Sequence, residues 1–289
     1  MDHYFLNEQT NMKRIVEIGP GFYNIRANFY YDCTGIINFG THMSIIKLDS
    51  GRFVIIDTVG IDNDLKAEID TLTQNGQLIE AVIATHPFHT TYFPAFYKLY
   101  PQLKYIGTPR HLRIQPEIKW ATDVSQDYVL RMFEPEINMR IADGSEFVNP
   151  DPDNHFNNVF VYHPKSKTLH CDDTLMYFNN PGCLFGCCGG VKANTIYMHL
   201  ALTTVGLKPD VEAPNEFKRW IFKMMDDWDF ENLVVAHNGT CIGGAKDTVM
   251  KTLLKIVPLL EKMVQDRKER QQELSRGQTV EGTVSVNPM

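Results

Sequence analysis

The chain has 289 residues, of which 43% are hydrophobic and 22% are charged, so it is long enough to bury a sizeable core. Its net charge of −7 argues against a phosphate-neutralising surface, so we expect no nucleic-acid partner. The sequence shows no signal-peptide pattern and no apolar run long enough to span a bilayer. Six cysteines in this length do not make a disulfide scaffold, so we expect a cytoplasmic protein without membrane association.

Short apolar runs in the first half of the chain predict β-strands. Asp49, Ser50 and Gly51 favour a tight reversal between two of these runs. Residues 62–74 carry apolar side chains at spacings of four and three, which predicts a helix, and residues 91–99 predict another. The predicted strands are Ile15–Ile18, Phe22–Ile25, Met43–Leu48, Phe53–Ile56, Leu78–Ala84 and Leu103–Ile106.

The second half of the chain predicts a hairpin, one further strand and three helices. The turn sequence Pro164–Lys167 lies between apolar runs at 159–162 and 168–171, which is typical of a hairpin. We expect His163 and His170 to lie on the surface of this hairpin. Residues 233–236 predict a strand, and residues 194–205, 214–226 and 245–264 predict helices.

Three regions follow from this pattern. Residues 1–12 are expected to form an N-terminal extension, and residues 13–265 one α/β domain. Residues 266–289 are charged and then rich in Gly, Ser and Thr, so we expect a disordered polar tail.

Four strand-like runs each end at a titratable side chain. The first two runs end at Asp57 and His86, the third at Asp172 and Asp173, and the fourth at His237. Open α/β sheets place their sites at the carboxyl ends of strands, where side chains and loops converge beyond the core. Imidazole together with carboxylate suits Zn, Fe or Mn. The sequence therefore predicts a shared metal pocket at one edge of the sheets.

The order of these residues resembles the metallo-β-lactamase superfamily. The matching residues are Asp57, Thr85-His86, His155 before the hairpin, Asp173-Thr174-Leu175, and Ala236-His237. The resemblance covers roughly residues 16–264 in the order of elements. It implies an α/β fold in the form of a four-layer αββα sandwich. The segments around His86-Pro-Phe-His89 and Tyr162-His163-Pro164 are similar to a divergent, poorly characterised branch of that superfamily.

The central His-x-His-x-Asp-His motif of the superfamily is incomplete in this chain, which reads His86-Pro87-Phe88-His89-Thr90-Thr91. Phenylalanine cannot bind a metal, and a neutral threonine hydroxyl is a weak ligand beside carboxylate or imidazole. We therefore expect one divalent transition metal, Zn or Fe, in place of the usual pair.

His86, His155 and Asp173 are the candidate ligands that the resemblance leaves for this metal, with open positions for water or substrate. His89 is a candidate fourth ligand, and its structural alternative is a residue at a helix start. The structural alternative for His86 is a capping or core histidine, and for His155 it is a loop histidine. The alternative for Asp173 is a carboxylate that caps a turn. Asp172 competes with Asp173 for the ligand position.

Two further side chains are given roles beside the metal. Asp173 and His237 are the candidate catalytic residues, with His237 orienting substrate or shuttling a proton. The alternative for His237 is a hydrogen bond at a strand end. Asp57 is expected to fix the tautomer of a metal-binding histidine.

The Cys183–Cys188 segment matches no standard zinc or iron–sulfur spacing. Its position after Asp173 suggests a lid with glycine hinges at Gly186, Gly189 and Gly190. Aromatic residues between Phe88 and Tyr100 are interpreted mainly as core and rim packing, with an apolar substrate pocket as the alternative.

Three functions remain open at this point. The leading hypothesis is a metal-dependent hydrolase, in which an acidified water attacks an ester, amide or phosphoester of a small substrate. The second is a mononuclear Fe(II) oxygenase, because persulfide dioxygenases of the superfamily use the corresponding His, His and Asp. The third is a catalytically inactive binding module, which the loss of central motif positions favours.

Overall fold

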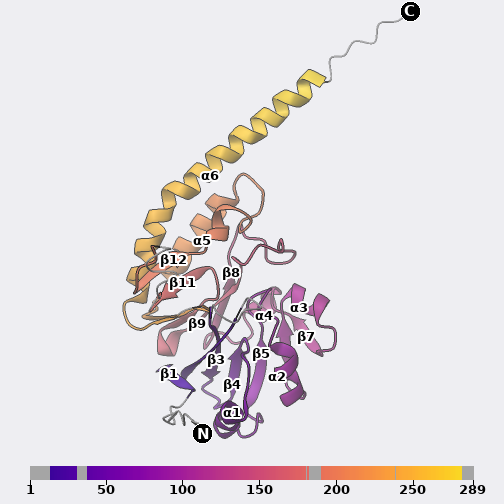
Figure 1. Ribbon diagram of the computed structural model, residues 1–289, viewed down its shortest axis with the longest axis vertical. Helices are drawn as coiled ribbons and strands as arrows, with labels where there is room; N and C mark the ends of the chain where they lie inside the picture. The colour runs from indigo at the N-terminus through magenta and orange to yellow at the C-terminus, as the bar shows by residue number, and fades with distance from the viewer. Residues whose placement is uncertain (1–13, 31–37, 180, 182–189, 238, 282–289) are drawn as a thin grey trace, which may run out of the picture.

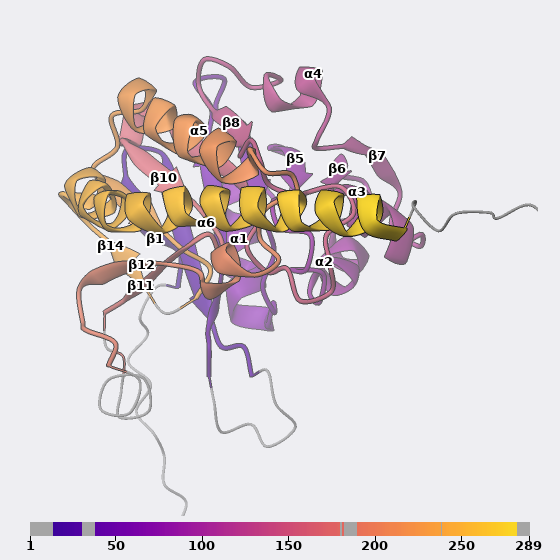
Figure 2. The ribbon, with the colours of Figure 1, turned by 90° about the horizontal axis from the view of Figure 1, so that it is seen from above.

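Two β-sheets pack face to face, and helices cover the outer face of each (Figures 1 and 2). The structure is a computed structural model that describes residues 14–30, 38–179, 181, 190–237 and 239–281. The predicted N-terminal extension and the Cys183–Cys188 segment therefore lie outside the described residues. Among the described residues, no helix is both long enough and apolar enough to cross a membrane.

The first sheet has seven strands in sequence order, and the second has five in the order β14-β13-β10-β9-β8. A separate pair of strands, β11 and β12, lies outside both sheets. The strands of the first sheet are β1 (Val16–Gly19), β2 (Phe22–Ala27), β3 (Thr41–Lys47), β4 (Phe53–Ile56), β5 (Ile79–Ile83), β6 (Tyr105–Gly107) and β7 (Trp120–Asp123). The remaining strands are β8 (Asn138–Ile141), β9 (Val159–His163), β10 (Thr168–His170), β11 (Leu175–Phe178), β12 (Thr195–Met198), β13 (Asn232–Val234) and β14 (Thr240–Cys241).

Six α-helices are described, and two of them begin with caps that the sequence supplies. Asp62 accepts the backbone N–H of Leu65 at the start of α1, and Thr108 accepts that of His111 at the start of α3. Helices α5 and α6 pack on each other beside the second sheet (Figure 2). The helices are α1 (Asn63–Thr73), α2 (Phe93–Leu99), α3 (Pro109–Ile114), α4 (Asp127–Leu130), α5 (Ala213–Asp227) and α6 (Ala245–Glu281).

Three apolar clusters fill the three spaces between the four layers. Along β4, Phe53 and Ile55 face the helix-side cluster with α1 and α2, whereas Val54 and Ile56 face the space between the sheets. Along β9, Phe160 belongs to the cluster with α5 and α6. This period-2 alternation is what strands buried on both faces require. The predicted αββα sandwich is confirmed.

The topology brings the ends of distant strands to a common edge. Strands β4, β5 and β6 are parallel to one another in the first sheet. In the second sheet β10 is parallel to β13. Side chains that directly follow these strands therefore emerge together, although the chain separates them by many residues.

The surface position predicted for two histidines of the β9–β10 hairpin is wrong. The hairpin itself is confirmed, with Thr168 paired to His163 and His170 to Val161. However, His163 and His170 are buried rather than at the surface. The reason is that β10 is an inner strand, bounded by β9 and β13, and its inward face lies against the first sheet.

Residues 194–205, predicted as a helix, instead form β12 and a short 3₁₀ helix at Leu200–Thr203. The run Thr195-Ile196-Tyr197 is rich in β-branched and aromatic side chains, which fit a strand, and it pairs with β11.

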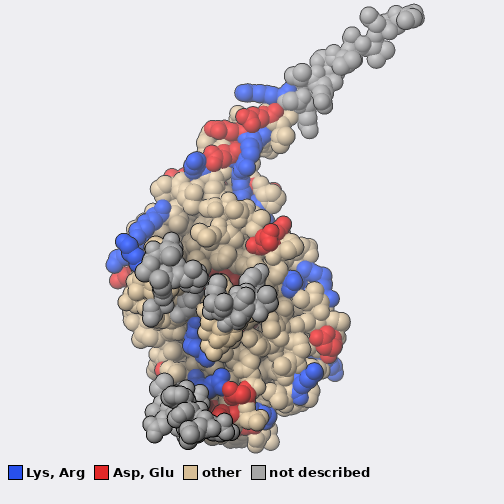
Figure 3. Space-filling model, in the orientation of Figure 1, with Lys and Arg blue, Asp and Glu red and all other residues tan. Residues whose placement is uncertain are grey.

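Residues 266–281, expected to be disordered, are also helical, because α6 continues to Glu281 and projects from the body (Figure 1). Blue and red side chains mix along this projecting part (Figure 3). Contacts between residues four apart, such as Gln265 Nε2 to Glu269 Oε1 at 2.7 Å, support it.

Candidate metal centre

The site begins with a sharp turn at the end of β4. Asp57 has a φ of 55°, in the left-handed region that side chains other than glycine seldom adopt. In this conformation the Asp57 carboxylate accepts the backbone N–H of Thr85 at 2.9 Å and contacts the Thr85 hydroxyl. The turn after β4 thus fixes the turn after β5, where His86 follows Thr85.

Three ligand atoms converge beyond the ends of β5 and β10. His86 Nε2, His89 Nε2 and a carboxylate oxygen of Asp173 all lie within 4.8 Å of one another. Asp173 Oδ2 is 3.4 Å from each of the two nitrogens. A tetrahedral ion with bonds of about 2.05 Å separates its ligands by about 3.3 Å, so the spacing fits one metal.

The atoms of this group include two that the rest of the described structure does not satisfy. His89 Nε2 and Asp173 Oδ1 are buried and have no hydrogen-bond partner among the described residues. Burial alone would raise the pKa of Asp173, but His237, His89 and His86 hold it well below its usual range. These two atoms are held by ion-pair contacts only, His89 Nε2 to Asp173 Oδ2 at 3.4 Å and Asp173 Oδ1 to His237 Nε2 at 3.2 Å, and a divalent cation would satisfy both.

The two histidines differ in how well they are prepared for a metal. His89 Nδ1 is 3.6 Å from Asp172 Oδ1, so this carboxylate orients the ring. Burial alone would lower the pKa of His89, but Asp173 and Asp172 raise it well above its usual value, so a metal has to displace the proton on Nε2. His86 Nδ1 instead accepts the backbone N–H of Phe88 at 3.1 Å, and its Nε2 lies 3.3 Å from the carbonyl of His155. Neutral His86 therefore carries its proton on Nε2, and its hydrogen bonds must change before it binds a metal.

His155 and His237 lie at the rim of this group. His155 Nδ1 is 4.0 Å from Asp173 Oδ2, and its side chain is 40% exposed. His237 Nε2 is 3.2 Å from Asp173 Oδ1, and its Nδ1 lies 2.7 Å from the carbonyl of Gly40, to which it can only donate. The structure thus brings together all five predicted site residues, with His89 nearer the centre than His155.

Arg26 holds the segment that carries His237. Its guanidinium donates to the carbonyls of Ala236 at 3.1 Å and Gly239 at 3.3 Å, and also to that of Val235. No carboxylate pairs with this guanidinium among the described residues. Burial lowers the pKa of Arg26 to about 10, which still leaves it charged at neutral pH. The sequence analysis missed Arg26, because a lone arginine in a strand carries no motif.

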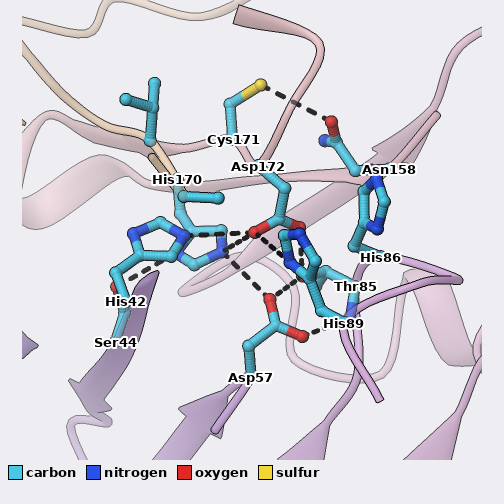
Figure 4. A network of polar contacts seen from close by, with 12 residues as sticks. His42, Ser44, Asp57, Thr85, His86, His89, Asn158, His170, Cys171 and Asp172 are labelled. Carbon is cyan, nitrogen blue, oxygen red and sulfur yellow. Dashed lines mark hydrogen bonds and ion pairs between the residues drawn. The ribbon is translucent and has the colours of Figure 1, made fainter. Parts of the chain in front are cut away.

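A second cluster of titratable side chains lies beneath the first, between the two sheets (Figure 4). We call it the inner cluster; it consists of His42, Asp57, Thr85, His170 and Asp172. His42 Nε2 is 3.1 Å from Asp172 Oδ1, and the rings of His42 and His170 stack at 4.3 Å. Asp172 Oδ2 accepts the Thr85 hydroxyl at 2.7 Å.

The inner cluster combines two carboxylates with opposite protonation tendencies. Burial and the charge of Asp172 raise the pKa of Asp57, whereas His170 and His42 outweigh burial and lower that of Asp172. His170 Nε2 lies 3.4 Å from Asp57 and 3.5 Å from Asp172. Burial alone would lower the pKa of His170, but these two carboxylates raise it to about 9. The charged groups of the inner cluster therefore pair with one another.

The position of Asp57 differs from the role predicted for it. The nearest imidazole is that of His170, which is not one of the candidate ligands, so Asp57 acts on the site through Thr85. His42 and His170 were missed as members of a polar cluster. A signal was present, because His42 and Ser44 alternate with apolar Met43 and Ile45 on β3, which places both polar residues on the inner face.

A pocket of about 430 Å³ opens over the candidate ligands. Its lining combines aromatic rings, threonines, histidines and the Asp173 carboxylate. The lining residues are Phe29, Phe39, Thr41, Thr58, Phe88, His89, Thr91, Tyr92, His155, Asp173, His199 and His237.

The same arrangement of layers occurs in solved structures. A metallo-β-lactamase from Pontibacter korlensis is 12% identical, with a TM-score of 0.52 over 83% of this chain and 98% of the other. The FIM-1 metallo-β-lactamase from Pseudomonas aeruginosa, in its mono-zinc form, is 10% identical, with a TM-score of 0.52 over 83% and 94%. A putative diflavin flavoprotein from Nostoc sp. PCC 7120 is 14% identical, with a TM-score of 0.51 over 88% and 97%.

These likenesses identify the fold and not the reaction, because the identities are low and the proteins named have different activities. No protein-family sequence model matches the chain, and no curated protein matches it in sequence. The chain has the metallo-β-lactamase fold, with a histidine and aspartate group that could hold a metal at the position its strand ends define.

Proposed function

We propose that the chain is a mononuclear metal-dependent hydrolase of small substrates. The observation that carries this proposal is the convergence of His86 Nε2, His89 Nε2 and Asp173 Oδ2 beside a pocket of substrate size. Two imidazoles and one carboxylate leave coordination positions open, as catalytic metal sites do. When bound, a divalent metal there would acidify a water and polarise the group under attack.

The side chains around the ligands supply the remaining parts of a hydrolytic reaction. Asp173 is held ionised and stays in place through its contacts with His86, His89 and His237. His237 is fixed at Nδ1 by the Gly40 carbonyl, so its Nε2 faces the pocket and can accept or return a proton. The water oxygen forms the new bond to carbon, the bond to the leaving group breaks, and the leaving group takes the proton.

An Fe(II) oxygenase is the second candidate. The same three ligands form a 2-His-1-carboxylate set, the arrangement that non-haem iron oxygenases use. Iron content and substrate-dependent oxygen uptake would distinguish this activity from hydrolysis.

Elemental analysis of the full chain, purified without chelator and then reloaded with zinc or iron, tests the metal directly. We expect about one equivalent of one metal, and binding that His89→Ala abolishes. The matched control is His199→Ala, because His199 lines the same pocket but is outside the three-atom group. Less than about half an equivalent after reloading would favour an inactive binding module on this fold.

A further inference from the structure

The walls of the pocket carry aromatic rings and no cationic side chain. Phe29, Phe39, Phe88 and Tyr92 supply the rings, and none of the described lining residues is lysine or arginine. Arginine and lysine are the side chains that proteins most often use to recognise a phosphate or carboxylate group away from a metal.

The two arginines nearest this region are engaged elsewhere. The Arg26 guanidinium donates hydrogen bonds to the carbonyls of Val235, Ala236 and Gly239. Arg110 stacks on Phe88 at 4.4 Å from the ring centroid and donates to the carbonyl of Pro87 at 3.2 Å. Neither lines the pocket, so neither meets a ligand there.

From these observations we infer the substrate class: an uncharged ester or amide with an apolar acyl group, rather than a phosphoester or a carboxylate-bearing compound. This inference rests on the proposed hydrolase function. Aromatic walls bind an acyl chain through removal of apolar surface from water. One positive charge remains when a divalent metal meets Asp173, but an anionic group away from that metal meets aromatic rings, hydroxyls and imidazoles, with no lysine or arginine among the described lining residues.

The reaction of this class needs no further reactant. Water adds its oxygen to the acyl carbon, the bond from that carbon to the alcohol oxygen or amide nitrogen breaks, and the leaving atom takes a proton. The products are a carboxylic acid and an alcohol or amine.

Substrate preference of the zinc-loaded full chain tests the inference. The probes are p-nitrophenyl esters with acyl chains of increasing length, the same esters with a terminal carboxylate, and bis(p-nitrophenyl) phosphate. We expect kcat/KM to rise roughly threefold with each added methylene until the pocket is full. We expect the carboxylate esters and the phosphodiester to react at least about 100-fold more slowly. Equal or faster reaction of either anionic probe would overturn the inference.

A charge placed in the pocket sharpens this test. Thr91 lines the pocket and is exposed, so Thr91→Lys can add a cation there without disturbing the core. We expect this variant to narrow the preference for uncharged over carboxylate esters by about tenfold. Thr71→Lys is the matched control, because Thr71 is exposed on α1 and outside the pocket, and it should leave the preference unchanged.

A binding measurement separates failure of the pocket inference from failure of the hydrolase proposal. Titration of metal-depleted protein with octanamide, an uncharged probe, should show binding that Phe88→Ala weakens and that octanoate does not match. If octanamide binds but no ester is hydrolysed, the pocket inference stands and the hydrolase proposal fails. If esters are hydrolysed without dependence on chain length, and octanamide does not bind, the pocket inference fails.

Discussion

Two neighbouring groups of histidine and aspartate, only one residue apart in the chain, have different surroundings. Asp173 faces His86, His89 and His237 at the base of an open pocket, and two polar atoms of that outer group have no hydrogen-bond partner in the described structure. Asp172 faces His42, His170 and Thr85 between the two sheets, where its carboxylate accepts hydrogen bonds. The inner cluster also has a buried atom without a hydrogen-bond partner, His170 Nε2, and its His42, His170 and Asp172 could hold an ion by spacing alone. The difference between the two groups is therefore access, because His89 and Asp173 line the pocket and no residue of the inner cluster does.

The comparison also gives the inner cluster a functional consequence. Asp172 Oδ1 is 3.6 Å from His89 Nδ1, so the carboxylate that holds the inner cluster together also orients a histidine of the outer group. Phe88 occupies the place of the ligand that the superfamily motif would supply, and His89 is the next residue. The inner cluster thus positions the histidine that, under the proposed function, would replace this ligand.

The largest effect is expected from Asp173→Asn. The substitution keeps the shape of the side chain but removes the negative charge that faces the histidines of the outer group. We expect metal affinity and hydrolysis to fall by more than about 100-fold, beyond the range for residues that only support a ligand. Zinc titration and ester hydrolysis measure the two effects. Undiminished zinc binding in this variant would show that Asp173 is not a ligand.

The neighbouring substitution Asp172→Asn is expected to act mainly on the fold. It removes the fully buried charge that His42 and His170 face, and breaking a buried pair in this way costs about 3–5 kcal/mol. Urea unfolding of the metal-free protein measures this loss, and Asp173→Asn serves as the matched control with a smaller change expected. If both variants lost the same stability, the distinction between the two groups would not hold.

The stability of the metal-free protein should decrease as pH rises from about 6.5 to 9. The pKa of His170 is raised to about 9 by Asp172 and Asp57 against the effect of burial, so its stabilising charge is fully present below pH 6.5 and is lost toward pH 9. We expect this residue to account for a fall of at most about 3 kcal/mol in the free energy of unfolding. The decrease should become smaller in His170→Gln, and the remainder is expected from His89, whose pKa Asp173 and Asp172 also raise against burial. An unchanged decrease in this variant would show that His170 does not contribute to it.

A smaller effect is expected from Arg26→Lys. Lysine retains the charge but cannot reach several carbonyls at once with a planar fork, so the segment carrying His237 would lose part of its anchor. We expect kcat for ester hydrolysis to fall by about tenfold with zinc content and KM unchanged. Arg52→Lys is the control, because Arg52 pairs with Glu80 away from the pocket. An unchanged kcat would remove Arg26 from the positioning of His237.

The site residues that the sequence analysis selected at strand ends share one property. Asp57, His86, Asp173 and His237 each follow an apolar run that ends abruptly, and a parallel strand delivers the residue after its end to the site edge whatever its neighbours are. His155 lies in a loop, and its distance from Asp173 could not follow from a strand pattern.

The wrong predictions concern residues whose surroundings depend on contacts that are distant in the sequence. His163 and His170 were assigned to a hairpin surface because a hairpin considered alone exposes one face, but packing against the first sheet buries them. Residues 194–205 were predicted to be helical, and pairing with β11 makes part of them a strand. In each case a long-range contact overrode a local preference.

The sequence by itself determined the αββα fold and predicted both the site residues at the strand ends and a single metal, because each depends on local pattern and residue type. Only the tertiary structure decided that His89 lies nearer the centre than His155, and that Asp172 belongs to an inner cluster with His42 and His170. The physical reason is that β3 and β10 belong to different sheets. Side chains that meet between two sheets are brought together by packing, which no spacing along the chain records.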